Sequence, residues 1–421
     1  MTTSNNDKTG TAYRNYVLAM LTLVYVFNFI DRQLLVILQE SIKTELSLSD
    51  TQLGLLLGFT FAIFYVTMGI PLARLADRGN RRNIVTVSLG LWSLMTALCG
   101  LANSYAQLLL ARIGVGIGEA GGSPPAHAMI SDYFPPGKRA TALSVYSTGI
   151  YFGMLIGYLM GGYLNEELGW RMAFFVLGIP GVLFSLLFLV TVKEPRRGAM
   201  DANVLQTEHH SFTQVLKLLF SKSTFVYLAI AAGLHAFCIY GVFNWVPSFM
   251  QRLHGMSKAE TGITLGLIVG VGGIIGTFAG GLLTDRFARN DKRWYLKIPA
   301  YAILSSIPFL WGGLYLSDLV SSLICMGMCN ALYGMYLGPA ITVVHSLVPT
   351  SMRALSSAIL FLVINLIGLG LGPLTVGVIS DVLTPSFGNE SLRFAMSSLL
   401  IVSAVSTLLF FKAAGKMVKD L

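Results

Sequence analysis

Twelve apolar stretches, each long enough to cross a membrane as a helix, leave this 421-residue chain little room for any other fold. A transmembrane helix needs about 20 apolar residues, whereas a transmembrane β-barrel shows alternating segments of about ten. Only 12% of the residues are charged, about half the share in soluble domains. The sequence therefore predicts an all-α membrane protein with twelve transmembrane helices, near residues 15–38, 51–73, 83–102, 105–130, 140–164, 171–192, 223–250, 260–283, 295–316, 319–346, 354–381 and 391–412.

The longest polar interval divides these stretches into six and six. We expect an N-terminal six-helix bundle at 1–192, a linker at 193–222 with a short amphipathic helix near 212–220, and a C-terminal bundle at 223–421. The halves repeat each other, because LARLADRGNRRN (72–83) matches GLLTDRFARNDKRW (281–294) and FPPGKRATALS (134–144) matches VPTSMRALSS (348–357). Pseudo-symmetric halves indicate a transporter with its substrate site between them, near the midplane of the membrane.

Lysine and arginine residues are concentrated in every second loop, in the linker and near both termini. Positive loops remain on the cytoplasmic side of a membrane. We therefore expect both termini and the linker to be cytoplasmic, in the cell's inner (plasma) membrane, with the first apolar stretch acting as an anchor. The same asymmetry explains the net charge of +9 without a nucleic-acid partner.

Four charged residues lie inside apolar stretches of the first half. Arg112 and Glu119 are seven residues apart in LLLARIGVGIGEAGG (108–122) and therefore share a helix face, and Asp31 and Arg32 lie in the first stretch. A charge at membrane depth is costly and usually marks a substrate or ion path. Counting along the helices places Asp31 and Arg112 at similar depth and Glu119 nearer the midplane. We therefore expect Arg112 to pair with Asp31 and with Glu119 in different states, although a purely structural ion pair is the alternative.

This arrangement is suited to proton coupling. Burial and a neighbouring arginine act in opposite directions on the proton affinity of a carboxylate, so a conformational change can load and unload a proton. Arginine keeps its own proton, but it can exchange a carboxylate for an anionic headgroup. Asp31 and Glu119 are the candidate proton sites and Arg112 is their partner, while Arg32 either anchors a headgroup or extends to the outer surface.

The second half has a different character, because its stretches carry no charged residue at mid-depth. A cavity that is charged on one wall and apolar and aromatic on the other suits an amphipathic ligand, although ordinary helix packing is the alternative for each aromatic residue. His235 is expected to be packed rather than to carry a proton. The candidate substrate-binding residues are Arg32, Arg112, Glu119, Tyr240, Phe243, Asn244, Trp245, Asn330 and Tyr333.

Charged residues at the cytoplasmic helix ends are candidates for gating, through pairs between the halves that hold an outward-open state. The alternative is that they only orient the chain and contact lipid phosphates. These residues are Asp77, Arg78, Arg81, Arg82, Arg139, Asp285 and Arg286. A stripe of small residues in the fifth stretch predicts close helix packing; it comprises Gly149, Gly153, Gly157, Gly161 and Gly162.

Several of these motifs resemble those of the major facilitator superfamily. The loop after the second stretch is similar to the family's Gly-x-Leu-x-Asp-Arg-x-Gly-Arg-Arg motif at Leu75, Asp77, Arg78, Arg81 and Arg82, with Ala73 and Asn80 in place of its glycines. The fourth stretch resembles the family's arginine-centred motif at Arg112, Gly116 and Gly118. GMLIGYLMGG (153–162) resembles the antiporter signature, with Tyr158 where proline is usual. FNFIDRQLL (27–35), RIGVGIGEA (112–120) and DRGNRR (77–82) are similar to the spinster branch.

The resemblance implies a monomeric, proton-coupled secondary transporter that moves sphingolipids such as sphingosine-1-phosphate, or lysophospholipids, by alternating access. Its expected partners are this substrate, protons and membrane lipids. A proton-linked carrier of small organic anions or sugar acids is the alternative, and it would be expected to carry a basic or polar residue in the second half as well. An enzyme is not expected, because no clustered nucleophile and base is present, and neither a cofactor nor a metal is expected. A receptor-like relative is disfavoured by the intramembrane charges.

Overall fold

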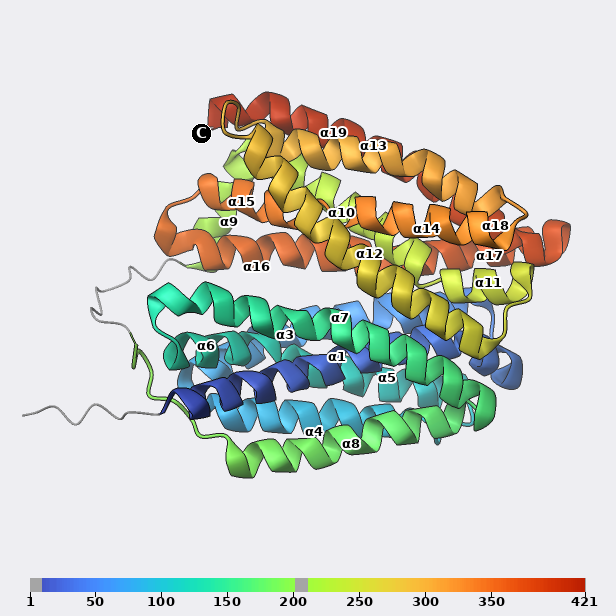
Figure 1. Cartoon of the computed structure of the whole chain (residues 1–421), viewed down its shortest axis with the longest axis horizontal. Coiled ribbons are helices and arrows are strands. Elements are labelled where there is room, and N and C mark those ends of the chain that lie inside the picture. Colours follow the sequence, from blue (N-terminus) through green and yellow to red (C-terminus); the bar gives the residue numbers. More distant parts are fainter. Residues whose placement is uncertain (1–9, 201–210, 421) are drawn as a thin grey trace, which may run out of the picture.

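The computed structural model describes residues 10–200 and 211–420, and the side chains of Asp77, Ala140 and Thr350 lie outside the described part. The described residues form helices joined by short connections (Figure 1). In the first half these are α1 Thr11–Leu46, α2 Asp50–Gly54, the π-helical turn η1 Leu55–Phe59, α3 Thr60–Arg78, α4 Arg81–Cys99, α5 Tyr105–Ala120, α6 Ser123–Tyr133, α7 Pro136–Glu167 and α8 Trp170–Thr191.

In the second half, α9 (Phe212–Ser221) precedes a second set of helices. These are α10 Ser223–Phe243, α11 Val246–His254, α12 Lys258–Phe287, α13 Trp294–Tyr315, α14 Leu319–Tyr333, α15 Leu337–Ser346, the 3₁₀ turn η2 Thr350–Met352, α16 Arg353–Ile364, the π-helical turn η3 Asn365–Leu371, α17 Gly372–Phe387, the 3₁₀ turn η4 Gly388–Glu390, α18 Ser391–Ser397 and α19 Leu399–Asp420. Capping boxes begin three of the helices in the described chain, at Ser49, Ser211 and Ser257, where each serine and the third residue after it satisfy one another's backbone N–H groups.

Ten helical stretches of the described chain are long and apolar enough to cross a membrane. The last of them, Arg353–Asp420, runs the length of the molecule and returns, and so makes two crossings (Figure 1). A further crossing is made by α5 and α6, which are interrupted at Gly121 and Gly122. The predicted all-α architecture with twelve transmembrane helices is therefore confirmed.

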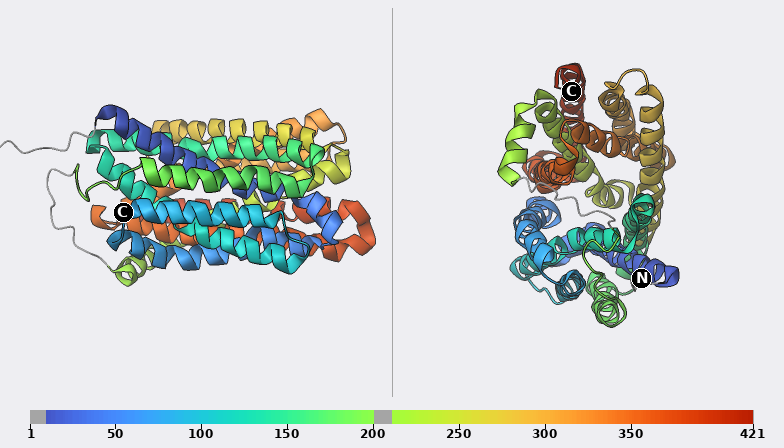
Figure 2. Two further views of the ribbon diagram at one scale, coloured as in Figure 1. Left: turned by 90° about the horizontal axis from the view of Figure 1, so that it is seen from below. Right: turned by 90° about the vertical axis from the view of Figure 1, so that its left-hand side faces the viewer.

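The helices form two bundles, one from α1 to α8 and the other from α10 to α19 (Figures 1 and 2). We call the end of the molecule that carries the linker and the C-terminus the linker end, and the opposite end the far end. Residues 193–198 bind to the first bundle, since the Lys193 N–H donates to the Tyr13 hydroxyl at 2.8 Å and the Gly198 N–H donates to Asp132 at 3.0 Å. Helix α9 instead buries Val215 and Leu219 against the second bundle.

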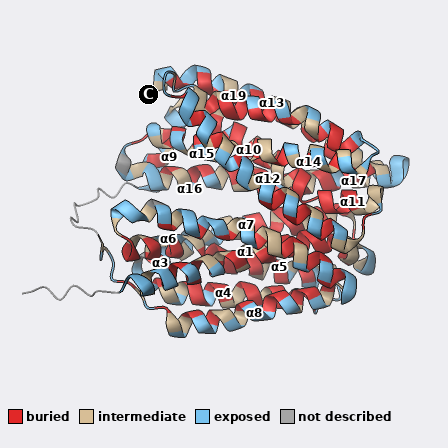
Figure 3. Cartoon of the chain, viewed as in Figure 1, coloured by how far each residue is buried: buried red, intermediate tan, exposed pale blue. Residues whose placement is uncertain are grey.

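The bundles contact each other mainly toward the far end and diverge toward the linker end (Figure 1). Helix α7 packs against α12, and α2 with η1 packs against α17 and η3. Buried residues fill the interior of each bundle and also the far-end contact around α11 and α12 (Figure 3). Glycines bring these backbones together: an added Cβ at Gly58 would lie 2.4 Å from the Leu369 carbonyl oxygen, and one at Gly162 would lie 2.6 Å from that of Lys258.

Within the first bundle, four glycines of the α7 stripe, at 149, 153, 157 and 161, lie against α1. An added Cβ at Gly153 would lie 2.6 Å from both the Phe29 Cβ and the Val26 carbonyl oxygen. The fifth, Gly162, lies against α12 instead. The stripe therefore allows close packing of α7 on one helix of its own bundle and one helix of the other.

Replacing Gly153 with alanine is expected to lower the stability of the folded protein. The clash with α1 backbone atoms costs about 1–3 kcal/mol by overpacking, and the better helix propensity of alanine offsets at most about 1 kcal/mol of this. The midpoint of thermal unfolding in detergent should fall. Gly327→Ala in α14 is the matched control, because nothing lies within 4 Å of its added Cβ. Equal midpoints for the two variants would contradict the packing role.

Candidate charge site

The four charges within the first half come together between α1 and α5, three of them buried and Arg32 partly exposed. The Arg32 guanidinium donates from Nε to Glu119 Oε2 at 2.6 Å, with 19% of the Arg32 side chain exposed and none of the Glu119 side chain. Asp31 and Arg112 are also buried. All four residues belong to the first bundle, and Arg32 and Glu119 form a direct ion pair at the level where α5 approaches its break at Gly121.

Three aromatic rings surround the Arg32 guanidinium. Its Cζ lies 5.1, 4.8 and 5.2 Å from the ring centroids of Phe29, Phe61 and Tyr65. The Arg112 Cζ lies 5.8 Å from the same Phe61 ring. Cations are attracted to the faces of aromatic rings, and more strongly where water is excluded. The rings from α1 and α3 therefore hold an arginine whose anionic partner comes from α5.

Several buried polar atoms of the site make no hydrogen bond of normal geometry to a described residue. These are both carboxylate oxygens of Asp31, Nε and Nη1 of Arg112 and Oε1 of Glu119. The side chains of Thr96 and Asn28 lie near Asp31 and Glu119, respectively. Asp31 is 1% exposed and lies within electrostatic range of Glu119 and Arg112. Buried charged groups without hydrogen bonds are costly. A different conformation could therefore give the Arg112 donors a partner, and a proton could neutralise the carboxylate of Asp31 or Glu119.

The predicted pairing of Glu119 is changed by this geometry. In this conformation Glu119 binds Arg32, whereas Arg112 makes no hydrogen bond to either carboxylate through Nε or Nη1. Arg32 lies in the interior of the 36-residue helix α1 (Thr11–Leu46), and its guanidinium is directed to Glu119 of α5 and not along α1 to the membrane surface. The interpretation of Arg32 as a residue that extends to the outer surface therefore does not hold.

Most of the candidate residues of the second half are buried and have partners there. The Trp245 indole donates to the Pro373 carbonyl at 2.9 Å, and the Asn330 amide donates to the Ile268 carbonyl at 3.0 Å. The Tyr333 hydroxyl lies 3.2 Å from that of Ser403, and its ring packs near Phe243. Asn244 is buried as well, and its backbone carbonyl accepts a hydrogen bond from the Gln39 side chain of the other bundle at 2.7 Å.

Tyr240 is the candidate of the second half that the structure brings to the charge site. It is only partly buried and lies within electrostatic range of Arg32, across the contact between the bundles. His235 is buried between the rings of Tyr333 and Tyr336, and its Nε2 lies 3.0 Å from the Tyr333 carbonyl oxygen. Substrate contact by the other candidates of this half stays a prediction.

At the linker end, Arg81 and Arg82 of the first bundle form a hydrogen-bond network with Glu194 and Pro195 of the linker. Arg81 is buried and donates to Asp132 at 2.5 Å, to Glu194 at 2.7 Å and to the Pro195 carbonyl at 3.0 Å. The Arg82 N–H donates to Glu194 at 2.8 Å. In this conformation, Arg81 therefore connects the first bundle to its own linker.

The other candidate gating residues lie near this network or on the surface. Arg139 donates to the Ser131 and Phe134 carbonyls, and Arg78, Asp285 and Arg286 are exposed. The side chain of Asp77 lies outside the described part. A role of these residues in pairs between the bundles stays a prediction for another conformation.

Sequence reasoning missed a second charged cluster, at the far end, where Arg252 of α11 binds Glu40 and Asp50 of the first bundle. In the sequence, Arg252 has the position of an ordinary loop charge after the seventh apolar stretch. The signal available in the sequence was an acidic residue after the first stretch (Glu40), another before the second (Asp50), and a single arginine after the seventh (Arg252).

Comparison with known proteins agrees with this architecture. The family model described as Major Facilitator Superfamily matches residues 21–373. An MFS-type efflux pump of Mycolicibacterium smegmatis is 34% identical, over 100% of this chain and 97% of its own. Protein spinster homolog 1 of Xenopus laevis is 27% identical, over 89% of this chain and 74% of its own.

A solved structure is similar over almost the whole chain. It is described as a bacterial homolog to the human lysosomal transporter Spinster, in an inward-facing and unoccupied conformation. It superposes with a TM-score of 0.91 at 32% identity, covering 98% of this chain and 99% of that one. The two chains therefore share the arrangement of their helices over almost their whole length.

Proposed function

Because this chain belongs to the major facilitator superfamily and is a transporter of its spinster branch, we propose that it moves an amphipathic lipid by proton-coupled alternating access. The proposed substrate is a lysophospholipid or a sphingoid-type lipid with an anionic headgroup. The observation that carries this proposal is the ion pair between the partly exposed Arg32 and the buried Glu119, with the guanidinium among three aromatic rings.

The proton acts on Glu119 in this mechanism. Protonation removes the negative charge that binds Arg32, and Arg32 itself keeps its charge because guanidinium does not lose its proton in proteins. The arginine is then available to an anionic headgroup. Asp31 is a second proton site, and Arg112 is the cation within range of both carboxylates. Proton uptake by Glu119 and headgroup binding by Arg32 therefore both favour the separation of Arg32 from Glu119.

The lipid tail is accommodated by the apolar and aromatic side of the site. The transmembrane stretches of the second half carry no lysine or arginine at mid-depth, so that one wall offers charge and the facing wall offers Tyr240 and apolar surface. An amphiphile fits this asymmetry better than a sugar acid, which would need polar groups on both walls. This asymmetry favours the lipid over the organic-anion alternative.

We also propose an orientation. The linker end carries most of the lysines and arginines, and on the positive-inside rule it faces the cytoplasm. With the bundles in contact at the far end, this conformation is then inward-facing, in the inner (plasma) membrane. The protein acts as a monomer, with membrane lipids as its surroundings.

The test is uptake of a labelled lysophospholipid by purified protein in proteoliposomes, with and without an imposed pH gradient. Extraction of the outer leaflet with albumin separates the lipid that has crossed from the lipid that has only adsorbed. We expect gradient-dependent uptake that falls at least about tenfold in Arg32→Gln, a loss of about 1.4 kcal/mol or more. Arg74→Gln is the control, because Arg74 is exposed at the linker end.

Two outcomes would contradict parts of the proposal. Uptake that ignores the gradient would remove the proton mechanism and leave lipid transport in place. Transport of labelled hexuronate or dicarboxylate, in protein that moves no lipid, would put the organic-anion carrier ahead.

A further inference from the structure

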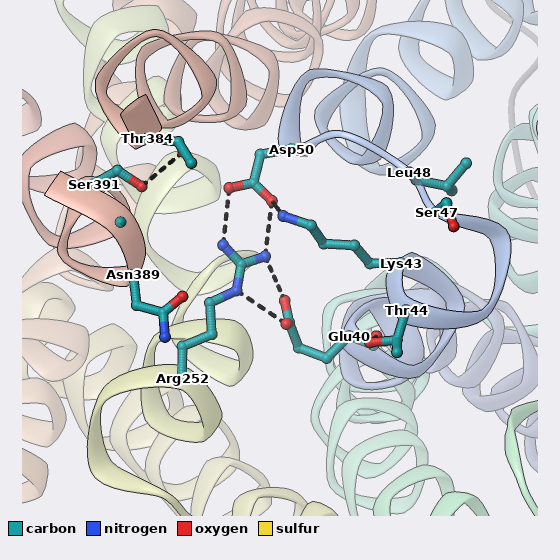
Figure 4. Close-up of a pocket in the computed structure, with 11 residues that line it drawn as sticks. Glu40, Lys43, Thr44, Ser47, Leu48, Asp50, Arg252, Thr384, Asn389 and Ser391 are labelled. Atoms are coloured by element: carbon teal, nitrogen blue, oxygen red, sulfur yellow. Dashed lines mark hydrogen bonds and ion pairs between the residues drawn. The ribbon is translucent and has the colours of Figure 1, made fainter. Parts of the chain in front are cut away.

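The guanidinium of Arg252 binds two carboxylates of the opposite bundle. It donates to Glu40 at 2.6 and 2.9 Å and to Asp50 at 2.7 and 2.8 Å, so that each contact is bidentate (Figure 4). Arg252 lies on α11 of the second bundle, while Glu40 lies on α1 and Asp50 begins α2. Bidentate arginine–carboxylate pairs are the strongest and most directional ion pairs in proteins.

Asp50 is the centre of this cluster, with 1% of its side chain exposed. Besides Arg252, it binds Lys43 of α1 and accepts a hydrogen bond from the Ser380 hydroxyl of α17 at 2.6 Å. A second carboxylate of α17, Asp381, accepts from the backbone N–H groups of Asp50 at 2.9 Å and Thr51 at 2.7 Å. Asp381 of the second bundle therefore caps the helix that Asp50 begins. Each bundle thus supplies a carboxylate that binds donors of the other.

The four charged side chains Glu40, Lys43, Asp50 and Arg252 are balanced, two negative and two positive, and we call them the far-end cluster. They line a polar cavity of about 480 Å³ at the far end. Two neighbouring ion pairs among the described residues stay within one bundle: Arg171 binds Glu45 in the first, and Arg393 binds Glu390 in the second. The far-end cluster thus differs from its neighbours in joining the halves.

We infer that Arg252 and Asp50 are the gating residues of the far end, and that their separation is the step that opens the molecule there. Any opening at this end parts α1 and α2 from α11 and α17, and so must break the contacts of Arg252 to Glu40 and Asp50. Glu40, Asp50 and Lys43 lie on one side of the opening, and Arg252 and Asp381 lie on the other. After opening, the three charges of the first bundle leave a net negative charge on their side, and Arg252 loses both of its carboxylate partners.

The role of this step in transport rests on the proposed function, but the step itself can be measured without a substrate. Spin labels at Ala106 and Ser386, exposed positions on either bundle at the far end, report the opening there. Labels at Lys138 and Ala354 report the linker end in the same way. Cys325 is replaced by serine, since the other three cysteines are buried.

In Arg252→Ala we expect a new, longer distance for the Ala106–Ser386 pair in more than half of the molecules, with a matching shorter distance for Lys138–Ala354. Arg171→Ala is the control, because Arg171 has the same charge at the same end but a partner in its own bundle. The reciprocal change separates gating from local unfolding, which would lengthen one distance only. Glu40→Arg combined with Arg252→Glu exchanges the partners and should restore part of the closed population.

Unchanged distance distributions in Arg252→Ala and also in Asp50→Asn would overturn the inference. Should Arg252→Ala fail to fold, Glu40→Gln removes one of the two bidentate contacts and leaves Asp50 with both of its cations. This variant should show a smaller shift in the same direction. A shift in these distances in a protein that transports no lipid would refute the proposed function and leave the gate in place, whereas lipid transport without any shift would do the reverse.

Discussion

Glu119→Gln is expected to abolish the stimulation of lipid uptake by a pH gradient. Glutamine keeps the size of the side chain and an oxygen that can accept from Arg32, but it carries no charge and binds no proton. Removing one partner of a buried pair leaves the other charge uncompensated, at a cost of about 3–5 kcal/mol to the conformation that contains the pair. The variant should therefore populate the rearranged state regardless of pH, and uptake with and without a gradient should become equal.

The measurement is the ratio of uptake rates with and without the gradient, in proteoliposomes of equal protein content. Glu167→Gln is the control, since Glu167 is an exposed carboxylate at the far end of α7. A ratio that survives in Glu119→Gln and is lost in Asp31→Asn would move the proton site to Asp31. A ratio that survives in both variants would exclude proton coupling through this site.

Gly262→Ala is expected to shift the molecule away from the conformation in which the far end is closed. An added Cβ would lie 2.4 Å from the Tyr158 carbonyl oxygen and 3.1 Å from the Gly162 Cα, both in α7 of the other bundle. These are backbone atoms, so no side-chain rotation relieves the clash. An overpacking penalty of about 1–3 kcal/mol acts on the closed state, which corresponds to a shift of about 5- to 150-fold in the equilibrium.

The labelled pair Ala106–Ser386 measures this shift directly. Gly281→Ala in the same helix α12 is the matched control, because nothing lies within 4 Å of its added Cβ. Gly153→Ala strains a contact inside one bundle, so it should reduce stability while leaving the two label distances unchanged. An unchanged distance in Gly262→Ala would mean that α12 moves with α7, and that the bundles part elsewhere.

Architecture could be predicted from the sequence because the apolar stretches and the repeated loop motifs are local signals. The four charges Asp31, Arg32, Arg112 and Glu119 could be selected from the sequence because charged residues are rare in apolar stretches, and the structure brings them together between α1 and α5. Their pairing could not be predicted, because spacing along one helix does not determine which arginine Glu119 binds; that depends on how α1 and α5 are rotated and packed against each other.

The far-end cluster could not be predicted for another reason. Glu40, Asp50 and Arg252 are ordinary loop-end charges in the sequence, and only the approach of the two bundles joins them. The aromatic residues of the second half pose the same difficulty, because the sequence does not distinguish Trp245, which is buried against its own bundle, from Tyr240, which approaches Arg32. Contacts within a helix can be read from spacing, but contacts between bundles require the fold.

Helix α1 carries Arg32 at the charge site and Glu40 in the far-end cluster, eight residues apart, which is about 12 Å along one continuous helix. The segment η1–α3 also contacts both the second bundle and the charge site. Gly58 of η1 packs against the Leu369 carbonyl, and Phe61 and Tyr65 of α3 face Arg32. Helix α1 and the continuous segment η1–α3 thus both extend from the contact between the bundles to Arg32 and the aromatic rings around it. We expect mechanical transmission in both directions along them: a tilt at the far end displaces the rings relative to the guanidinium, and a change in the charge on Glu119 alters the force that holds the far end shut.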